Sequence, residues 1–237
     1  MQEAISQLRS GLELIERLPG GPDRWRRELD LQFQHCRAVA ALKSIAAPAV
    51  GAGYARAHQL CSQLNWPPQT LDVLYGEFSY FMHRAELEPA TRLADEIMRL
   101  GKSSNDLTLL AAGHSAIGYI CLHTGKLTDA HSHLERTLGL LDTSGASSRY
   151  LFGHVAFLAW TLFFLGFVDE GRRHWDSALA EARRMKSLPT VAYVLTMSLW
   201  RLETLPVLIR RAEELVEMAT EQGFIQRRYE GLEVLGW

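Results

Sequence analysis

The chain has 237 residues, of which 47% are hydrophobic and 22% are charged, and its formal net charge is −2. This composition is typical of a globular protein and excludes an intrinsically disordered chain. The balanced charge also excludes an extended phosphate-binding surface, because affinity for nucleic acid needs Lys and Arg gathered on one face.

The cysteines and the apolar segments predict where the protein resides. Cys36, Cys61 and Cys121 are odd in number and widely spaced, which indicates reduced thiols and a cytoplasmic protein rather than a disulfide framework. The first 18 residues, MQEAISQLRSGLELIERL, are amphipathic and do not resemble a signal peptide. The longest apolar stretch, 155–168, is shorter than the ~20 residues that cross a bilayer. We therefore expect a cytoplasmic protein with no membrane segment.

Apolar residues recur at intervals of three and four, and no Asn-Gly or Asp-Gly hairpin occurs, so the pattern predicts helices throughout. The first three predicted helices are 3–18, 23–43 and a helix from Pro48 that ends before Asn65. Three pairs follow, at 69–83 with 89–100, 106–123 with 127–141, and 149–165 with 169–185. The last three are 189–202, 206–222 and 224–237. Gly125, Gly166 and Gly223 come just after predicted helix ends, where a left-handed residue is favoured.

One segment of the chain repeats itself. Residues 114–138 align with residues 155–179 when Gly125 is placed on Gly166, which gives an offset of 41 residues. Leu134 then falls on Trp175, and the other apolar positions also coincide. A period of this length predicts an α-solenoid, in which each helix pair buries its apolar face by stacking on the next pair.

The 114–142 segment resembles a tetratricopeptide repeat, with Gly118 and Ala130 at the two small positions where the helices of a pair touch. The 155–185 segment has Ala159 and Gly171 at the same positions, and a third such segment spans 74–100. The resemblance implies an all-α solenoid of antiparallel helix pairs with about 11 helices, wound as a right-handed superhelix. It also implies a single domain over 1–237 whose role is binding rather than catalysis.

Three strings show a narrower resemblance. RRELDLQ (26–32), AAPAVGAGYARAHQLCSQL (46–64) and ATEQGF (219–224) are similar to the C-terminal repeat region of large bacterial signalling ATPases, which often carry a class III adenylate or guanylate cyclase domain. The chain contains no G-x-x-x-x-G-K-[ST] loop and no cyclase motif, so neither activity carries over to it. The resemblance implies a regulatory, partner-sensing repeat region in bacterial signal transduction.

No pattern in the sequence predicts an enzyme, a metal site or a cofactor. His131 and His133 are two residues apart, so on a helix they point about 200° apart and do not share an ion. Ser115 lies next to a histidine, but no G-x-S-x-G turn is present. Arg183-Arg184 and the acidic run over 213–221 are interpreted as solvated helix faces.

The repeat register gives the candidate binding residues. In tetratricopeptide arrays certain first-helix positions face the concave surface, and by resemblance these are Tyr75, Met82, His83, Tyr119, His123, Phe157, Trp160 and Phe164. Tyr and Trp are common binding hot spots. The alternative is that longer helices shift the register and bury these residues between helices.

The leading hypothesis is a non-catalytic scaffold that presents this surface to a protein or peptide partner, with Tyr119, Phe157 and Trp160 as anchors. One alternative is a sensor that binds a small apolar effector in the same place. Another is a module for homo-oligomerisation, such as a homodimer. Nucleic acid and membrane partners are not expected.

Overall fold

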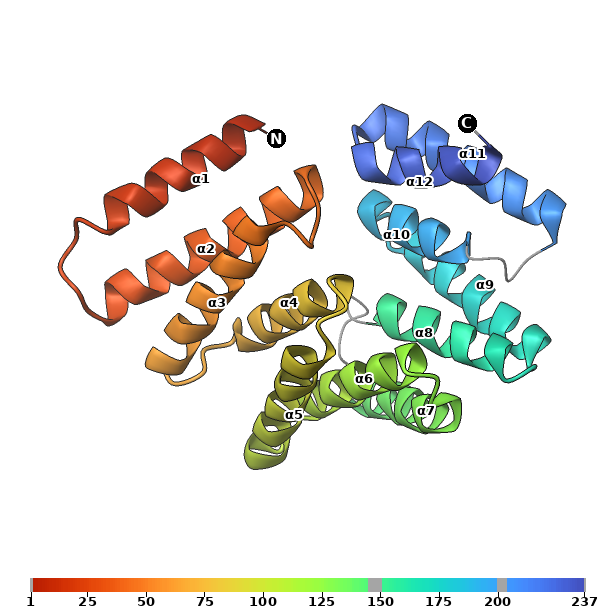
Figure 1. Ribbon diagram of the computed structural model, residues 1–237, viewed down its shortest axis with the longest axis horizontal. Coiled ribbons are helices and arrows are strands. Elements are labelled where there is room, and N and C mark those ends of the chain that lie inside the picture. The colour runs from red at the N-terminus through yellow and green to blue at the C-terminus, as the bar shows by residue number, and fades with distance from the viewer. Residues whose placement is uncertain (1, 145–150, 200–203, 237) are drawn as a thin grey trace. The chain divides into compact units, whose positions relative to one another are not determined.

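A computed structural model of the chain describes residues 2–144, 151–199 and 204–236. Within these residues the chain forms twelve α-helices and no strand, which confirms the all-α class, with one helix more than the expected eleven. The helices are α1 Gln2–Ile15, α2 Pro22–Leu42, α3 Pro48–Gln63, α4 Thr70–His83, α5 Leu87–Ser104, α6 Leu107–His123, α7 Leu127–Ser144, α8 Leu151–Phe164, α9 Val168–Arg184, α10 Leu188–Ser198, α11 Leu205–Gln222 and α12 Ile225–Leu235 (Figure 1).

The helix boundaries lie within a few residues of those predicted. α3 begins at Pro48. Proline has no N–H group, and in the first turn of a helix that group would have no intrahelical acceptor. α6 is capped by Asp106, whose carboxylate accepts hydrogen bonds from the N–H groups of Thr108 and Leu109 at 2.8 and 3.1 Å. The expected boundaries at residues 149, 202 and 237 lie outside the described residues.

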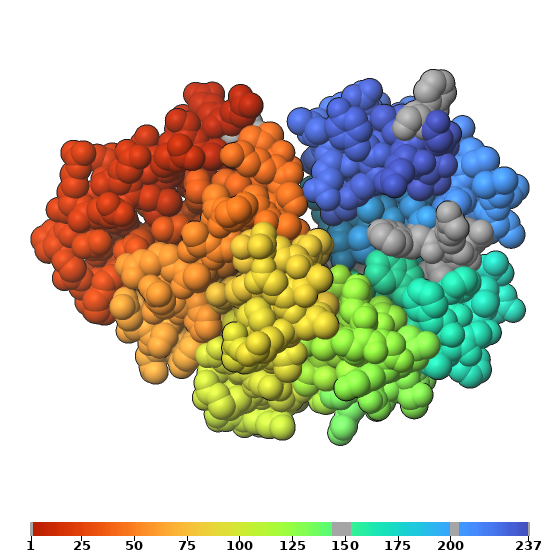
Figure 2. Space-filling model, in the orientation of Figure 1, coloured from red at the N-terminus to blue at the C-terminus, as the bar shows by residue number. Residues whose placement is uncertain are grey.

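The chain divides into two compact units, residues 1–99 and 100–237. In unit 1, α1 packs on α2, α2 on α3 and α3 on α4, and in unit 2 each helix from α6 to α11 packs on the next one in the chain. Within each unit consecutive helices run roughly antiparallel, and the described connections between them are short (Figure 1). Within each unit, side chains pack between neighbouring helices (Figure 2). This arrangement is a helical repeat. The single domain over 1–237 and the right-handed superhelix stay predictions.

Each unit has its own apolar core. In unit 1, Leu29, Leu60 and Val73 are buried together where α2, α3 and α4 meet. Unit 2 has one cluster around Leu134 on α7 and another around Trp175 on α9. Among the described helices, none is both long enough and apolar enough to cross a bilayer.

Buried carboxylates link the helices of unit 1. Glu28 on α2 accepts a hydrogen bond from Arg56 Nε on α3 at 2.6 Å. His58 on α3 joins two further helices, because its Nδ1 lies 2.8 Å from Glu77 on α4 and its Nε2 lies 3.4 Å from Glu96 on α5. The hydrogen bond to Glu77 raises the pKa of His58 against the opposing effect of burial, and the negative charges of both carboxylates add to the rise.

The turns confirm the predicted glycine positions. Gly125, Gly166 and Gly223 have φ angles of 75°, 92° and 69°, in the left-handed region that glycine adopts without strain. After Gly125, the N–H of Lys126 donates to the carbonyl of Cys121 at 2.9 Å, five residues back. This is the hydrogen bond of a Schellman motif, which satisfies a carbonyl at the helix end.

The small residues of the repeat lie where two backbones approach closely. A Cβ added to Gly171 on α9 would lie 2.8 Å from the carbonyl oxygen of Ala159 on α8. A Cβ added to Gly118 on α6 would lie 2.8 Å from Leu134 Cγ and 3.4 Å from the carbonyl oxygen of Ala130, both on α7. The role assigned to these positions from the repeat pattern is therefore confirmed.

Replacing Gly171 with alanine should destabilise unit 2. Alanine normally stabilises a helix interior relative to glycine, but here the added methyl group meets backbone atoms, and overpacking of this kind costs about 1–3 kcal/mol. Gly139→Ala on α7 is the matched control, because a Cβ there has no neighbour within 4 Å. It should stabilise the protein by about 0.5–1 kcal/mol. Urea denaturation followed by circular dichroism measures both, and a stabilising Gly171→Ala would contradict the close approach.

Candidate protein-interaction surfaces

Three of the predicted binding residues lie on α4 in unit 1. Tyr75 is half-buried, with its ring 5.4 Å from that of Phe78. Met82 is 7% exposed and therefore belongs to the core. His83 is exposed, and its Nδ1 donates to the carbonyl of Ser79 at 2.8 Å. Only Tyr75 and His83 present surface to a partner.

Four others come together in unit 2, on α6 and α8, and are named here the aromatic cluster: Tyr119, His123, Phe157 and Trp160. The Tyr119 and Phe157 rings stack at 4.0 Å with an angle of 12° between their planes. His123 meets Tyr119 edge-on at 4.3 Å, and Trp160 lies 6.0 Å from Phe157. Stacked and edge-to-face arrangements are the favourable geometries for aromatic rings.

The members of the aromatic cluster differ in exposure. Phe157 is 7% exposed, so it supports the cluster from the core, as the alternative interpretation of the register expected. Tyr119 and Trp160 are half-buried and pack on the apolar core, while His123 is exposed. Burial raises the pKa of Tyr119 to about 12, so its hydroxyl stays protonated at neutral pH. The cluster thus offers rigid, half-buried aromatic edges beside a polar histidine.

The eighth predicted residue, Phe164, lies at the last turn of α8 and is 62% exposed. Its ring is 5.7 Å from that of Phe163, which packs against the core around Trp175. One of these two adjacent phenylalanines is therefore partly core and the other is surface.

The structure also pairs histidines that the sequence did not connect. Ser115 on α6 shares a hydrogen bond with His154 Nδ1 on α8, and these residues are 0% and 2% exposed. Burial lowers the pKa of His154 to about 3. Since both groups are enclosed, no substrate reaches them, and the pair is a packing contact. In the sequence Ser115 is adjacent to His114, and nothing in the pattern connects it to His154.

His114 on α6 lies opposite His133 on α7, with 2.9 Å between their Nδ1 atoms. A hydrogen bond at this distance requires one ring to donate and the other to accept, so the accepting ring is neutral. Burial, and then the neighbouring His133, lower the pKa of His114 to about 4. In the described part of the chain no group of three potential ligands could hold a metal ion.

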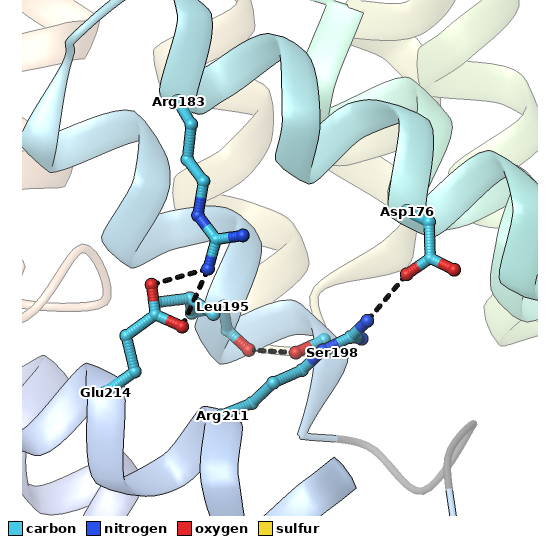
Figure 3. Close-up of polar contacts among 6 residues, drawn as sticks. All are labelled: Asp176, Arg183, Leu195, Ser198, Arg211 and Glu214. Atoms are coloured by element: carbon cyan, nitrogen blue, oxygen red, sulfur yellow. Dashed lines mark hydrogen bonds and ion pairs between the residues drawn. The ribbon is translucent and has the colours of Figure 1, made fainter.

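A charged pocket of about 400 Å³ lies between α9 and α11. This arginine pocket is lined by Asp176, Leu179, Ala180, Arg183, Arg210, Arg211 and Glu214. Two ion pairs cross it (Figure 3): Arg183 Nη2 donates to both oxygens of Glu214 at 2.6 and 2.7 Å, and Arg211 Nη2 donates to Asp176 at 2.7 Å.

The arginine pocket was not predicted from the sequence, in which Arg183 and Glu214 have the pattern of two separate solvated helix faces. A signal was present in the spacing. Asp176 and Arg183 are seven residues apart, which is two helical turns, so both lie on one face of α9. Arg211 and Glu214 are three residues apart and so lie on one face of α11, where their charges complement those of Asp176 and Arg183.

No known family model matches the chain, and no curated protein is similar to it in sequence. Solved structures do match it. One is the crystal structure of the apo form of RapI, with a TM-score of 0.65 and 15% sequence identity, over 97% of this chain and 89% of that chain. At this identity the likeness concerns the fold, and it agrees with a helical-repeat solenoid.

Proposed function

We propose that this chain is a non-catalytic interaction scaffold that binds a helical or extended peptide segment of a partner protein. The observation that carries the proposal is the aromatic cluster of α6 and α8. Tyr119 and Trp160 are the anchors, Phe157 holds Tyr119 in place by stacking, and His123 supplies a polar contact. Half-buried Tyr and Trp side chains lose little conformational entropy on binding, which is why they dominate many interfaces.

The fold supports a binding role. Helical repeats offer extended surfaces built from successive first helices, and peptide segments bind to such surfaces. RapI, one of the structural neighbours, is a helical-repeat protein of this kind. The resemblance to the repeat region of bacterial signalling ATPases suggests a cytoplasmic role in signal transduction. Phe164 is a further candidate contact on unit 2, and Tyr75 and His83 are candidate contacts on unit 1.

Peptide selection on the immobilised chain from a displayed random library, followed by calorimetric titration of the selected peptide, tests the proposal. Replacing Tyr119 and Trp160 together with alanine should abolish binding, because hot-spot residues each contribute about 2 kcal/mol or more. Far-ultraviolet circular dichroism should show little change in helicity.

The matched control replaces Phe167 and Tyr229 with alanine. These aromatic side chains are 56% and 64% exposed and lie outside the aromatic cluster. Their loss should leave the affinity unchanged. Equal affinities for the parent chain and the Tyr119/Trp160 variant would reject the site assignment.

Self-association is the second candidate function, and exposed apolar residues at one end of unit 2 favour it. Leu205 on α11 and Ile225 on α12 are 68% and 53% exposed, and Tyr229 lies one turn beyond Ile225. Light scattering over a dilution series distinguishes the two functions. A monomer at every concentration would remove self-association and leave these residues to another protein.

A further inference from the structure

We propose that the arginine pocket between α9 and α11 is a recognition site for a carboxylate group. The carboxylate is either the side chain of an acidic residue in a peptide or part of a free dicarboxylic acid. The pocket and the aromatic cluster are on different helices, so this inference stands or falls separately from the proposed function.

The pocket holds guanidinium donors that its own carboxylates do not use. Arg183 contacts Glu214 through Nη2 alone, and in the described part of the chain its Nε and Nη1 make no hydrogen bond. Arg210 lines the same pocket, and it has no ion pair with any residue in the described ranges. A guanidinium binds a carboxylate best with two parallel N–H groups, and Arg210 can supply such a pair. Arg183 adds a single donor from Nε or Nη1, because Glu214 holds its Nη2.

The charges of the lining select the ligand. Three arginines face two carboxylates, Asp176 and Glu214, which leaves one positive charge in excess. A carboxylate neutralises this excess. A phosphate dianion would leave a negative charge next to Asp176 and Glu214, and like charges at short range are unfavourable.

The apolar part of the lining favours an amino-acid side chain. Leu179 and Ala180 lie beside the arginines on α9. The methylene groups of a glutamate side chain can rest on these residues while its carboxylate reaches Arg210, and burial of each CH₂ is worth about 0.8 kcal/mol. A volume of about 400 Å³ is ample for one such side chain.

Calorimetric titration of the full chain with a capped peptide, acetyl-Gly-Glu-Leu-Glu-Gly-amide, tests the site at low salt. We expect saturable binding, and at least about tenfold weaker binding of the same peptide with Gln in place of Glu, because a charge-assisted pair is lost. Glutarate is the second probe. Equal affinity for glutarate would identify a free dicarboxylic acid as the source of the carboxylate, and tighter binding of the peptide would identify a peptide.

Three substitutions test the location of the site. Arg210→Glu should abolish binding, whereas Arg228→Glu, an exposed arginine on α12 with the same change of charge, should leave it nearly unchanged. Glu214→Gln should tighten binding severalfold, because it frees Arg183 and removes a competing carboxylate. The Arg183–Glu214 pair is exposed enough that its loss should not unfold the protein.

The proposal fails if Arg210→Glu and Arg228→Glu weaken binding equally, since that result would indicate attraction to net charge alone. It also fails if Glu214→Gln weakens binding, or if the Gln peptide binds as well as the Glu peptide. Displacement of the Glu peptide by inorganic phosphate at a lower concentration than by glutarate would overturn the choice of ligand.

Discussion

Replacing Trp175 with alanine should lower the free energy of unfolding of unit 2 by about 3–5 kcal/mol. The side chain is 1% exposed and is the largest in the cluster that joins α8, α9, α10 and α11. Removing it leaves a cavity next to Gly171 and Ala159, where the backbones of α8 and α9 are already in contact and cannot close further. The loss is a large part of the ~5–15 kcal/mol that stabilises a typical domain.

Trp175→Leu is the matched comparison, because Leu134 fills the equivalent position of the preceding repeat. Among the described residues, the indole Nε1 of Trp175 has no hydrogen-bond partner, and leucine removes this buried donor. The leucine variant should therefore lose clearly less stability than the alanine variant. Urea denaturation measures both, and equal losses would show that the cavity is not what determines stability at this position.

Acidification should destabilise unit 2 strongly. In the unfolded chain His154 takes up a proton near pH 6.5, whereas in the folded protein burial lowers its pKa to about 3. Below about pH 6.5 the unfolded state therefore binds more protons, and His154 alone should cost about 1.4 kcal/mol for each pH unit down to its folded pKa. His114, with its pKa lowered to about 4, adds to this loss.

For His58 in unit 1 the sign is reversed. The pKa of His58 is raised by its hydrogen bond to Glu77, so its contribution is fully present below about pH 6.5 and is lost as the pH rises through the folded pKa. Hydrogen exchange measured between about pH 7.5 and 5 should accordingly show protection falling in α6 and α8 while α3 and α4 gain protection.

A double substitution identifies the cause of the acid sensitivity. His154→Leu with Ser115→Ala replaces the buried polar pair by apolar groups, and the loss of stability between pH 6.5 and about 4.5 should shrink by about 2 kcal/mol. His58→Gln is the opposite control. It should remove the stabilisation of unit 1 at low pH and leave the destabilisation of unit 2 by acid unchanged. An unchanged pH profile in the double variant would show that His154 is not the titrating group.

The fold follows from local signals in the sequence. Gly125 and Gly166 mark turns whose conformation depends only on a few neighbouring residues. The spacing of apolar residues defines the buried face of each helix. The close contact at Gly171 could also be predicted, because the repeat offset of 41 residues places Gly171 on Ala130, another small residue. Tyr119, Phe157 and Trp160 lie on helices that the sequence predicts, α6 and α8. The burial of Phe157 could not be predicted, because it depends on how closely two helices approach.

The arginine pocket could not be predicted in the same way. Arg183 and Glu214 belong to α9 and α11, which are separated in the chain by all of α10. Their pairing depends on how three helices stack, and a charged residue on a solvated face has the same sequence pattern as one that faces a neighbouring helix. The Ser115–His154 hydrogen bond likewise joins α6 to α8 across α7.

The contact between α6 and α7 at Gly118 and Ala130 is rebuilt between α8 and α9 by Ala159 and Gly171, 41 residues later, with the glycine and the alanine exchanged. The two hairpins therefore have matching inner faces and equivalent turns. Tandem duplication of one whole hairpin would extend the array without disturbing the faces that neighbouring hairpins already use. A chain of this kind can thus gain or lose binding surface in steps of one repeat.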